Sequence, residues 1–239
     1  MKIPFESSVV KVNLESSSYK ILIGSEILKK SGELISSILI RKKVAIISDE
    51  NVAKRYLDNL VESLQSAEIS YCNFIVSPGE SSKDWKNLQS LVEWLILNKI
   101  ESEGPIIPLG GGVIGDLVGF AAAVLRRGVS VVQIPTSLLA QVDSSVGGKT
   151  GINSVNGKNL IGAFHQPKLV LSDISVLRSL NQRDFLSGYA EVVKYGLLCD
   201  PDFFYWLEKH SENILKRELE TLTFIVKKSC EIKARIVSI

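Results

Sequence analysis

Two glycine-rich turns carry the residues of this chain that are best suited to chemistry. The first reads Gly110-Gly111-Gly112-Val113-Ile114-Gly115-Asp116, and the second reads Val142-Asp143-Ser144-Ser145-Val146-Gly147-Gly148-Lys149-Thr150. Glycine lets the backbone approach a phosphate closely, and the start of a helix offers unpaired N–H groups to an anion. The two turns together predict a site that holds phosphates beside a polar substrate.

The first turn matches the G-x-G-x-x-G pattern of dinucleotide-binding sites at Gly110, Gly112 and Gly115. Its expected position, after a strand and before a helix, supports this interpretation. The pattern also requires an acidic residue about twenty residues further on, and 130–135 carries no carboxylate. A tight strand-to-helix turn without a ligand therefore remains an alternative.

Three further polar residues follow predicted strands, where a parallel sheet presents ligand contacts. Asp49 is suited to binding ribose hydroxyls or to capping the next helix. Glu80 and Lys83 follow the next strand, and an exposed ion pair is their alternative interpretation. Several lysines also lie in unusual local sequence, namely Lys149, Lys158, Lys194 and Lys233. If they converge on one pocket, they predict an anionic substrate that carries a phosphate and a carboxylate; separately, each is an ordinary surface lysine.

Glu191 is a candidate metal ligand or base. It shares a helix face with Lys194, so a plain salt bridge between the two is the alternative. A catalytic zinc site needs three protein ligands. The two histidines, His165 and His210, form no motif with familiar ligand spacing. We therefore expect that this chain alone does not supply a full metal site.

The elements that position these residues alternate between strand and helix along most of the chain. Strands are predicted at 9–12, 19–23, 43–48, 71–76, 105–109, 129–134 and 169–173, and helices at 51–65, 85–96, 117–125 and from 135 onward. This alternation predicts an α/β fold with a Rossmann-like parallel sheet over residues 1–175. Helices at 183–198, 201–215 and 218–239 predict an all-helical domain from 176 to 239. The apolar face of the last helix runs to Ile236, so we expect this domain to be incomplete and its last helix to lack a partner.

Composition sets further limits on the function. The 239 residues are 45% hydrophobic, and the net charge of +2 gives no argument for a nucleic-acid or membrane partner. The three cysteines form no C-x-x-C pair, which favours a reduced, cytoplasmic protein. We find no signal peptide and no apolar stretch of membrane-spanning length.

Read together, the motifs resemble the 3-dehydroquinate synthase family. The resemblance rests on the glycine turn at 110–116, the continuous segment 133–153, Gly157-Lys158-Asn159 and Ala190-Glu191-Val192-Val193-Lys194-Tyr195-Gly196. It implies an NAD-dependent lyase that uses zinc or cobalt, acts in the shikimate pathway, and is a homodimer at full length. The implied reaction converts 3-deoxy-D-arabino-heptulosonate 7-phosphate to 3-dehydroquinate and phosphate.

The resemblance also assigns roles to individual residues. The implied NAD contacts are Asp49, Glu80, Lys83, Gly110, Gly111, Gly112, Asp116, Thr136, Ser137 and Ser179, with Lys158 between the cofactor and the substrate. The implied substrate contacts are Asp143, Lys149, Asn159, Lys194 and Lys233, with Arg127 as a phosphate contact that reaches the neighbouring subunit's site. Glu191 is the implied zinc ligand.

The chain departs from the family pattern at three places. Ser179-Leu180-Asn181 stands where Thr-Leu-Pro is usual, and Ser137 replaces the second threonine; both keep a hydroxyl. The family's later Arg, Asn and two zinc histidines are not in this sequence, so we expect a fragment that is inactive alone. Two alternatives stay open, namely a related sugar-phosphate cyclase that takes a different heptulose and a non-catalytic NAD-binding fragment.

Overall fold

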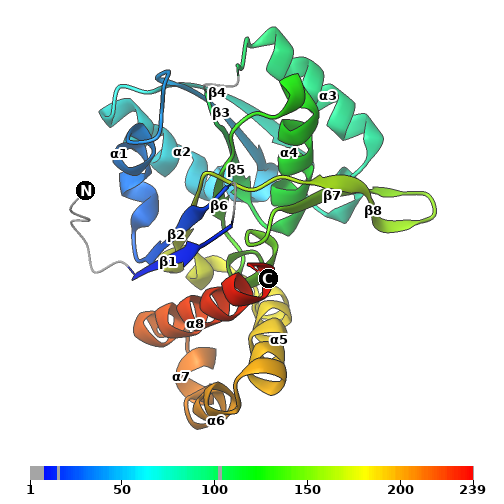
Figure 1. Ribbon diagram of the computed structural model, residues 1–239. Helices are drawn as coiled ribbons and strands as arrows, with labels where there is room; N and C mark the ends of the chain where they lie inside the picture. The colour runs from blue at the N-terminus through cyan, green and yellow to red at the C-terminus, as the bar shows by residue number, and fades with distance from the viewer. Residues whose placement is uncertain (1–7, 15–16, 102–103, 239) are drawn as a thin grey trace.

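The protein is a seven-stranded sheet covered by helices on both faces, with a helical group at one end (Figure 1). The computed structural model describes residues 8–14, 17–101 and 104–238. The strands of the main sheet are β1 (Ser8–Val12), β2 (Tyr19–Gly24), β3 (Lys43–Asp49), β4 (Ser70–Val76), β5 (Ile106–Gly110), β6 (Val132–Pro135) and β9 (Leu169–Asp173). Their order is β1-β2-β9-β6-β5-β3-β4, and every neighbouring pair is parallel except β1 with β2. The predicted parallel α/β sheet is confirmed.

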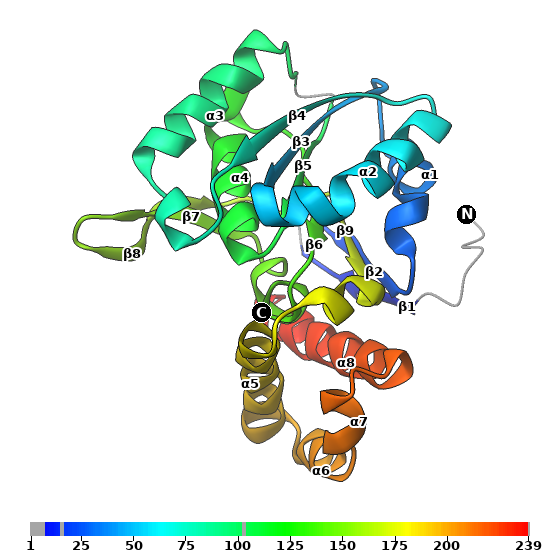
Figure 2. The ribbon, with the colours of Figure 1, turned by 180° about the vertical axis from the view of Figure 1, so that it is seen from behind.

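The helices that cover the sheet are α1 (Ser31–Ser36), α2 (Glu50–Ser66), α3 (Trp85–Leu97) and α4 (Gly112–Val124). Alternate residues of β3 point into two different cores. Ala45 and Ile47 pack with the apolar faces of α3 and α4, whereas Val44 and Ile46 pack with those of α1 and α2. This two-sided burial explains why β3 is a continuous apolar run rather than an alternating one. Figure 2 shows α1 and α2 on the face of the sheet that Figure 1 hides.

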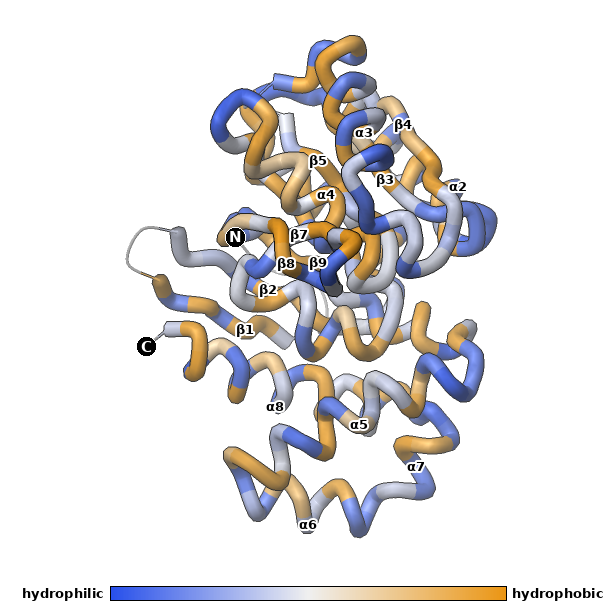
Figure 3. The backbone as a smooth tube through the Cα atoms, turned by 90° about the vertical axis from the view of Figure 1, so that its right-hand side faces the viewer, coloured by the Kyte–Doolittle hydropathy of each residue, from blue (hydrophilic) through white to orange (hydrophobic). Residues whose placement is uncertain are grey.

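A β-hairpin that the sequence patterns did not predict crosses the outer side of α4. It consists of β7 (Lys149–Ser154) and β8 (Gly157–Phe164), which pair antiparallel with an irregularity near Ile152. Gly119 of α4 permits the close contact, because a Cβ there would lie 2.4 Å from Cγ2 of Thr150. α4 is thus covered by the sheet on one side and the hairpin on the other. This burial explains why most of α4 has the colour of hydrophobic residues in Figure 3. Within the described part of the chain, none of the helices combines the length and apolar character needed to cross a membrane.

The helical group consists of α5 (Gln182–Cys199), α6 (Pro201–Lys209), α7 (Ser211–Leu215) and α8 (Leu219–Val237). The single helix predicted at 201–215 is interrupted at His210, which ends α6. The expectation that the last helix lacks a partner is wrong for most of its length. Its apolar residues Leu222, Ile225, Val226 and Ile232 are buried in one core with β1, β2 and the turn before β7, whereas Phe224 and Ile236 are partly exposed.

A five-residue π-helix, Ala140–Ser144, follows β6 and carries Asp143. The sequence predicted an ordinary helix here, because a single π-helical turn is rare and too short to leave a periodic signal of its own. Gln141 fixes the π-helix to the sheet by donating from Nε2 to the carbonyls of Pro135 and Asp173, at 3.1 and 2.8 Å. Asp143 therefore stands on a segment that is tied to the ends of two strands.

Helix α5 crosses the start of this segment at Gly188, where a Cβ would lie 2.5 Å from the backbone nitrogen of Leu139. We expect Gly188→Ala to lower the free energy of unfolding by about 1–3 kcal/mol, because the two backbones must separate. Urea unfolding measures this loss, with Arg183→Ala on the exposed face of α5 as the control. A Gly188→Ala protein as stable as the control would contradict this packing.

Candidate nucleotide and anion site

The carboxyl ends of β3, β5 and β6 open into two adjoining cavities of about 320 and 620 Å³. Both cavities are lined by Asp49, Gly79, Gly111, Ser137 and Asp184. Parallel strands place their carboxyl ends at one edge, so segments far apart in sequence meet here. Gly112 lines the smaller cavity, and Thr136 and Ser179 line the larger one.

The predicted glycine turn forms the floor of these cavities. Gly111 precedes α4 without offering a side-chain cap, so the first N–H groups of this helix lack the usual side-chain partner. A Cβ at Gly112 would lie 3.1 Å from Oγ of Ser144, which is tighter than ordinary contact. At Gly110 glycine is required by packing, because a Cβ there would lie 2.7 Å from the side chain of Ile114. The turn thus lets a ligand approach the backbone closely at the N-terminus of a helix, which suits an anionic group such as a pyrophosphate.

Asp49 caps α2 with one carboxylate oxygen, which accepts hydrogen bonds from the N–H groups of Asn51 and Val52 at 2.9 and 3.1 Å. The capping alternative is therefore what the structure contains. Because Asp49 also lines both cavities, its second oxygen remains available to a ligand hydroxyl. Among the polar residues of the larger cavity, Ser179 accepts a 2.5 Å hydrogen bond from the hydroxyl of Tyr56 and donates to the carbonyl of Val176.

Lys83 and its partners form a buried polar network behind the glycine turn. The ammonium of Lys83, only 3% exposed, contacts Oδ2 of Asp116 at 2.7 Å and Oδ1 of Asn159 at 2.5 Å. Asn153 extends the network, since it donates to Glu80 at 2.8 Å and accepts from the N–H of Asn159 at 2.9 Å. Burial raises the pKa of the Asp116 carboxyl, and Lys83 opposes this rise. The alternative of an exposed Glu80–Lys83 pair is wrong, because Lys83 is buried against other partners.

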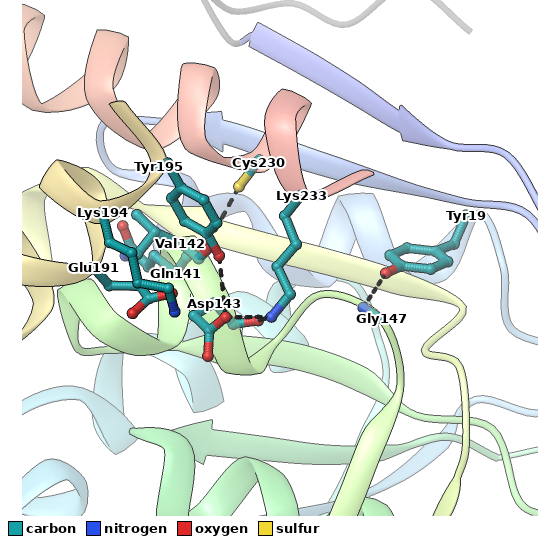
Figure 4. A network of polar contacts seen from close by, with 10 residues as sticks. All are labelled: Tyr19, Gln141, Val142, Asp143, Gly147, Glu191, Lys194, Tyr195, Cys230 and Lys233. Carbon is teal, nitrogen blue, oxygen red and sulfur yellow. Dashed lines mark hydrogen bonds and ion pairs between the residues drawn. The ribbon is translucent and has the colours of Figure 1, made fainter. Parts of the chain in front are cut away.

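A third cavity, of about 470 Å³, lies between the hairpin and the π-helix. Five residues with predicted ligand roles line it, namely Asp116, Asp143, Lys149, Asn159 and Lys233. Figure 4 shows that Asp143 points toward Lys233 of α8, whose ammonium lies 2.5 Å from Oδ1 of Asp143. The cavity therefore brings two lysines from distant segments together, as an anionic ligand requires.

Tyr195 is a neighbour of this cavity that the sequence analysis did not single out. Its hydroxyl donates to Oδ1 of Asp143 at 3.0 Å and lies 3.2 Å from the carbonyl of Val142 (Figure 4). Burial, with Asp143 nearby, raises the pKa of Tyr195, so the phenol stays protonated and remains a donor. Tyr19 is a second buried tyrosine, and its oxygen accepts a hydrogen bond from the N–H of Gly147 in the second glycine turn at 3.0 Å. Burial raises the pKa of Tyr19 to about 12.

Glu191 and Lys194 form an ion pair with a nitrogen–oxygen distance of 2.7 Å, close to Asp143 in Figure 4. The hydrogen bond to Glu191 raises the pKa of Lys194. In residues 8–14, 17–101 and 104–238, no three His, Cys, Asp or Glu side chains are grouped so that they could hold a metal ion. His165 contacts the carbonyl of Val129, and His210 contacts that of Trp206. The described residues thus offer Glu191 as a single candidate ligand, which does not amount to a metal site.

Seven residues with predicted ligand roles do not line the three cavities, namely Glu80, Lys83, Gly110, Arg127, Lys158, Glu191 and Lys194. Lys158 is exposed on β8, and Arg127 is exposed in the turn that follows α4. Arg127 is fifteen residues beyond Gly112, so the length of a helix separates it from the glycine turn by roughly 20 Å. The structure therefore does not bring Arg127 to the site of its own chain, whereas Lys158 is the chain neighbour of Asn159, which lines the third cavity.

Comparison with known proteins places this site in a family. A model described as "3-dehydroquinate synthase N-terminal" matches residues 73–187, and one described as "3-dehydroquinate synthase C-terminal" matches 188–239. Curated proteins named 3-dehydroquinate synthase from Cereibacter sphaeroides and Ruegeria pomeroyi are 52% and 51% identical to this chain over 96% of its length. The chain spans 62% of the length of each of these relatives.

Among solved structures, a 2-epi-5-epi-valiolone synthase from Streptomyces hygroscopicus with NAD⁺ and Zn²⁺ bound matches with a TM-score of 0.84 and 26% identity. That match covers 92% of this chain and 61% of the other. A 2-deoxy-scyllo-inosose synthase shares the fold, with a TM-score of 0.82 at 21% identity over 97% of this chain and 62% of the other. The two family models together extend from residue 73 to residue 239, in the order that the sequence motifs predict. This chain belongs to the 3-dehydroquinate synthase family.

Proposed function

We propose that this chain contributes the NAD site and most of the substrate-anion site of a 3-dehydroquinate synthase. The proposed reaction converts 3-deoxy-D-arabino-heptulosonate 7-phosphate to 3-dehydroquinate and phosphate. One observation carries the proposal: a single helix connects the two kinds of cavity. Gly112, at the start of α4, lines a glycine-floored cavity, and Asp116, one helical turn later, lines the cavity that contains Lys149 and Lys233. A cofactor and an anionic substrate would therefore bind next to each other.

Bound NAD would supply reversible oxidation of a substrate alcohol. The residues of this chain have the tasks of binding and orientation. Lys149 and Lys233 would balance the charges of the phosphate and the carboxylate, and the buried Lys83–Asp116 pair would hold Asn159 toward the substrate. Tyr195 and Lys233 would fix the carboxylate of Asp143 in one orientation. Holding a flexible polyanion in a reactive geometry is a large part of such catalysis.

The metal and the assembly are further parts of this proposal. Glu191 would be one ligand of zinc or cobalt, and none of the roles above depends on the metal. Residues 1–175 would form the NAD-binding domain and residues 176–239 the beginning of the helical domain. Arg127, remote from its own site, would contact a phosphate in the neighbouring subunit of a cytoplasmic homodimer.

Lys149→Ala and Lys194→Ala should each weaken binding of the sugar phosphate to the NAD-loaded protein by about 10-fold, as expected for the loss of one charge-assisted contact. NAD affinity should stay nearly unchanged, because neither lysine lines the two nucleotide cavities. Calorimetric titration measures both affinities, with Lys42→Ala, which pairs with Glu68 at the surface, as the control. Unchanged affinity in both variants would make these two residues ordinary surface lysines.

Genetic complementation tests the proposed function as a whole. The complete open reading frame that contains this chain should restore growth without aromatic amino acids to a bacterium that lacks 3-dehydroquinate synthase. The same frame with Lys83→Met and Asp143→Ala should not restore growth. Failure of the unaltered frame, when the protein accumulates in the cells, would reject this function and favour a cyclase that takes another heptulose or a protein that only binds NAD.

A further inference from the structure

We propose that Arg217, which lies outside every cavity described above, is a positioning residue for the wall of the larger nucleotide cavity. This inference rests on the proposed NAD site. Arg217 is in the turn between α7 and α8, and the wall that it supports is the segment from Leu177 to Asn181. Ser179, Leu180 and Asn181 of this segment line the 620 Å³ cavity.

The guanidinium of Arg217 binds this segment through its backbone. One nitrogen, Nη1, donates to the carbonyls of Leu180, Arg178 and Leu177 at 2.6, 3.0 and 3.4 Å. The second nitrogen, Nη2, lies 3.3 Å from Oε1 of Gln182, at the start of α5. The planar guanidinium reaches Gln182 with Nη2 and lies over the ring of Phe185 while Nη1 contacts the carbonyls, a combination that a lysine ammonium cannot match in geometry.

These carbonyls need a partner because regular structure ends here. A short 3₁₀-helix, Ile174–Ser179, ends within the segment, and Leu180 is extended with φ −64° and ψ 141°. The last carbonyls of a helix lack N–H donors within the helix, and Arg217 supplies donors to those of Arg178 and Leu180. The carbonyl of Leu177 also accepts from the N–H of Leu180, at 3.3 Å. Immediately afterwards, Asn181 caps α5 by accepting from the N–H of Asp184 at 2.8 Å. The cavity wall is therefore the end of a 3₁₀-helix and the short connection to α5, and side chains bind it at both ends.

A further contact of Arg217 and a contact from another helix hold this segment in place. The guanidinium carbon of Arg217 lies 4.7 Å from the ring centre of Phe185, which is fully buried in the core shared by the sheet and the helices. From α2, the hydroxyl of Tyr56 donates to Oγ of Ser179 at 2.5 Å and lies 3.0 Å from the carbonyl of Val176. The wall is thus held between α2 of the sheet layer and the helical group, which contributes Arg217 and the N–H of Phe185, donated to the carbonyl of Asn181 at 3.1 Å.

The backbone of Arg217 supports a role for its side chain. Its φ of +59° is left-handed, a conformation that is strained for a residue with a Cβ. Glycine or asparagine would fit this turn with less strain. The turn alone therefore does not explain an arginine, whereas the contacts to the cavity wall do.

The test compares Arg217→Asn with Lys216→Met. Asparagine tolerates the left-handed backbone and removes the guanidinium, so the variant is expected to fold. Lys216 is the neighbouring exposed residue and contacts only Glu212, at 3.7 Å. We expect Arg217→Asn to raise the NAD dissociation constant about 10-fold, while Lys216→Met leaves it unchanged. Arg217→Lys, which keeps the charge without the fork, should resemble Arg217→Asn.

Two readouts separate positioning from a general loss of stability. NAD affinity is measured well below the midpoint of thermal unfolding of each variant, and sugar-phosphate affinity is measured on the NAD-saturated protein, where it should not change. Unchanged NAD affinity in a folded Arg217→Asn protein would overturn the inference, as would an equal loss of both affinities. If the unaltered protein does not bind NAD, the proposed function fails instead, and the two failures are therefore distinguishable.

Discussion

Lys83→Met is expected to lower the free energy of unfolding by about 3–5 kcal/mol at neutral pH, because it leaves a buried carboxylate without its partner. Lys83 is 3% exposed, and the Asp116 carboxylate that it contacts is 20% exposed. Methionine preserves most of the side-chain volume, so the loss measures electrostatics rather than a cavity. Urea unfolding provides the measurement, with Lys42→Met at the surface as the control.

Two additional results would tie this loss to Asp116. The double variant Lys83→Met with Asp116→Asn should regain much of the stability, because it removes the unpaired charge. Since the pKa of Asp116 is already raised by burial, and Lys83 opposes that rise, Lys83→Met should raise it further. A carboxyl whose pKa is higher in the folded state stabilises the fold below its unfolded-state pKa, and this contribution is lost as the pH rises through the folded-state value.

The stability of Lys83→Met should consequently recover on acidification from pH 7 toward pH 4, relative to the unaltered protein. The double variant should not show this recovery. A Lys83→Met protein that is as stable as the control at neutral pH would mean that Asp116 is not the buried charge described here.

Gly112→Val is expected to weaken NAD binding by at least about 100-fold, close to loss of binding in a titration. A Cβ at this position already lies 3.1 Å from Oγ of Ser144, so the valine methyl groups must project into the space above the glycine turn. They would block the backbone approach that a pyrophosphate needs at the start of α4.

Gly112→Ala should give a smaller loss, because a single Cβ requires only a shift of the serine hydroxyl. Thermal unfolding of both variants checks that the fold is retained. If Gly112→Val bound NAD as tightly as the unaltered protein, the pyrophosphate would have to lie elsewhere and the assignment of these cavities would be wrong.

Much of the fold followed from local patterns because the sheet strands are short apolar runs between clear turns. β3, for example, is buried on both faces and reads as Lys43-Val44-Ala45-Ile46-Ile47-Ser48. The β7–β8 hairpin was not predicted because β8 is exposed along most of its length and has no apolar alternation. The predicted helix at 201–215 also divides at His210, whose backbone leaves the helical range with φ −109° and ψ 14°, and the apolar spacing gives no signal for this break.

The site shows the same division between local and tertiary information. Glycine turns and lysines beside them are visible in the sequence, and the resemblance to a family added their expected partners. Contacts that join distant segments carry no local signal. Tyr195 reaches Asp143 from 52 positions away, and Arg217 reaches Leu180 across 37 positions. Such residues only acquire a role once the helical group is packed against the sheet.

Product analysis on the complete open reading frame that contains this chain tests the central claim most directly. The purified protein, supplied with NAD, Zn²⁺ and 3-deoxy-D-arabino-heptulosonate 7-phosphate, is followed by phosphorus and carbon NMR. A heptulose phosphate without the carboxylate serves as the competing substrate. We predict one equivalent of phosphate for each 3-dehydroquinate formed, no net NADH, and little turnover of the competitor. Preferred turnover of the competitor, or no release of phosphate from either compound, would contradict the account.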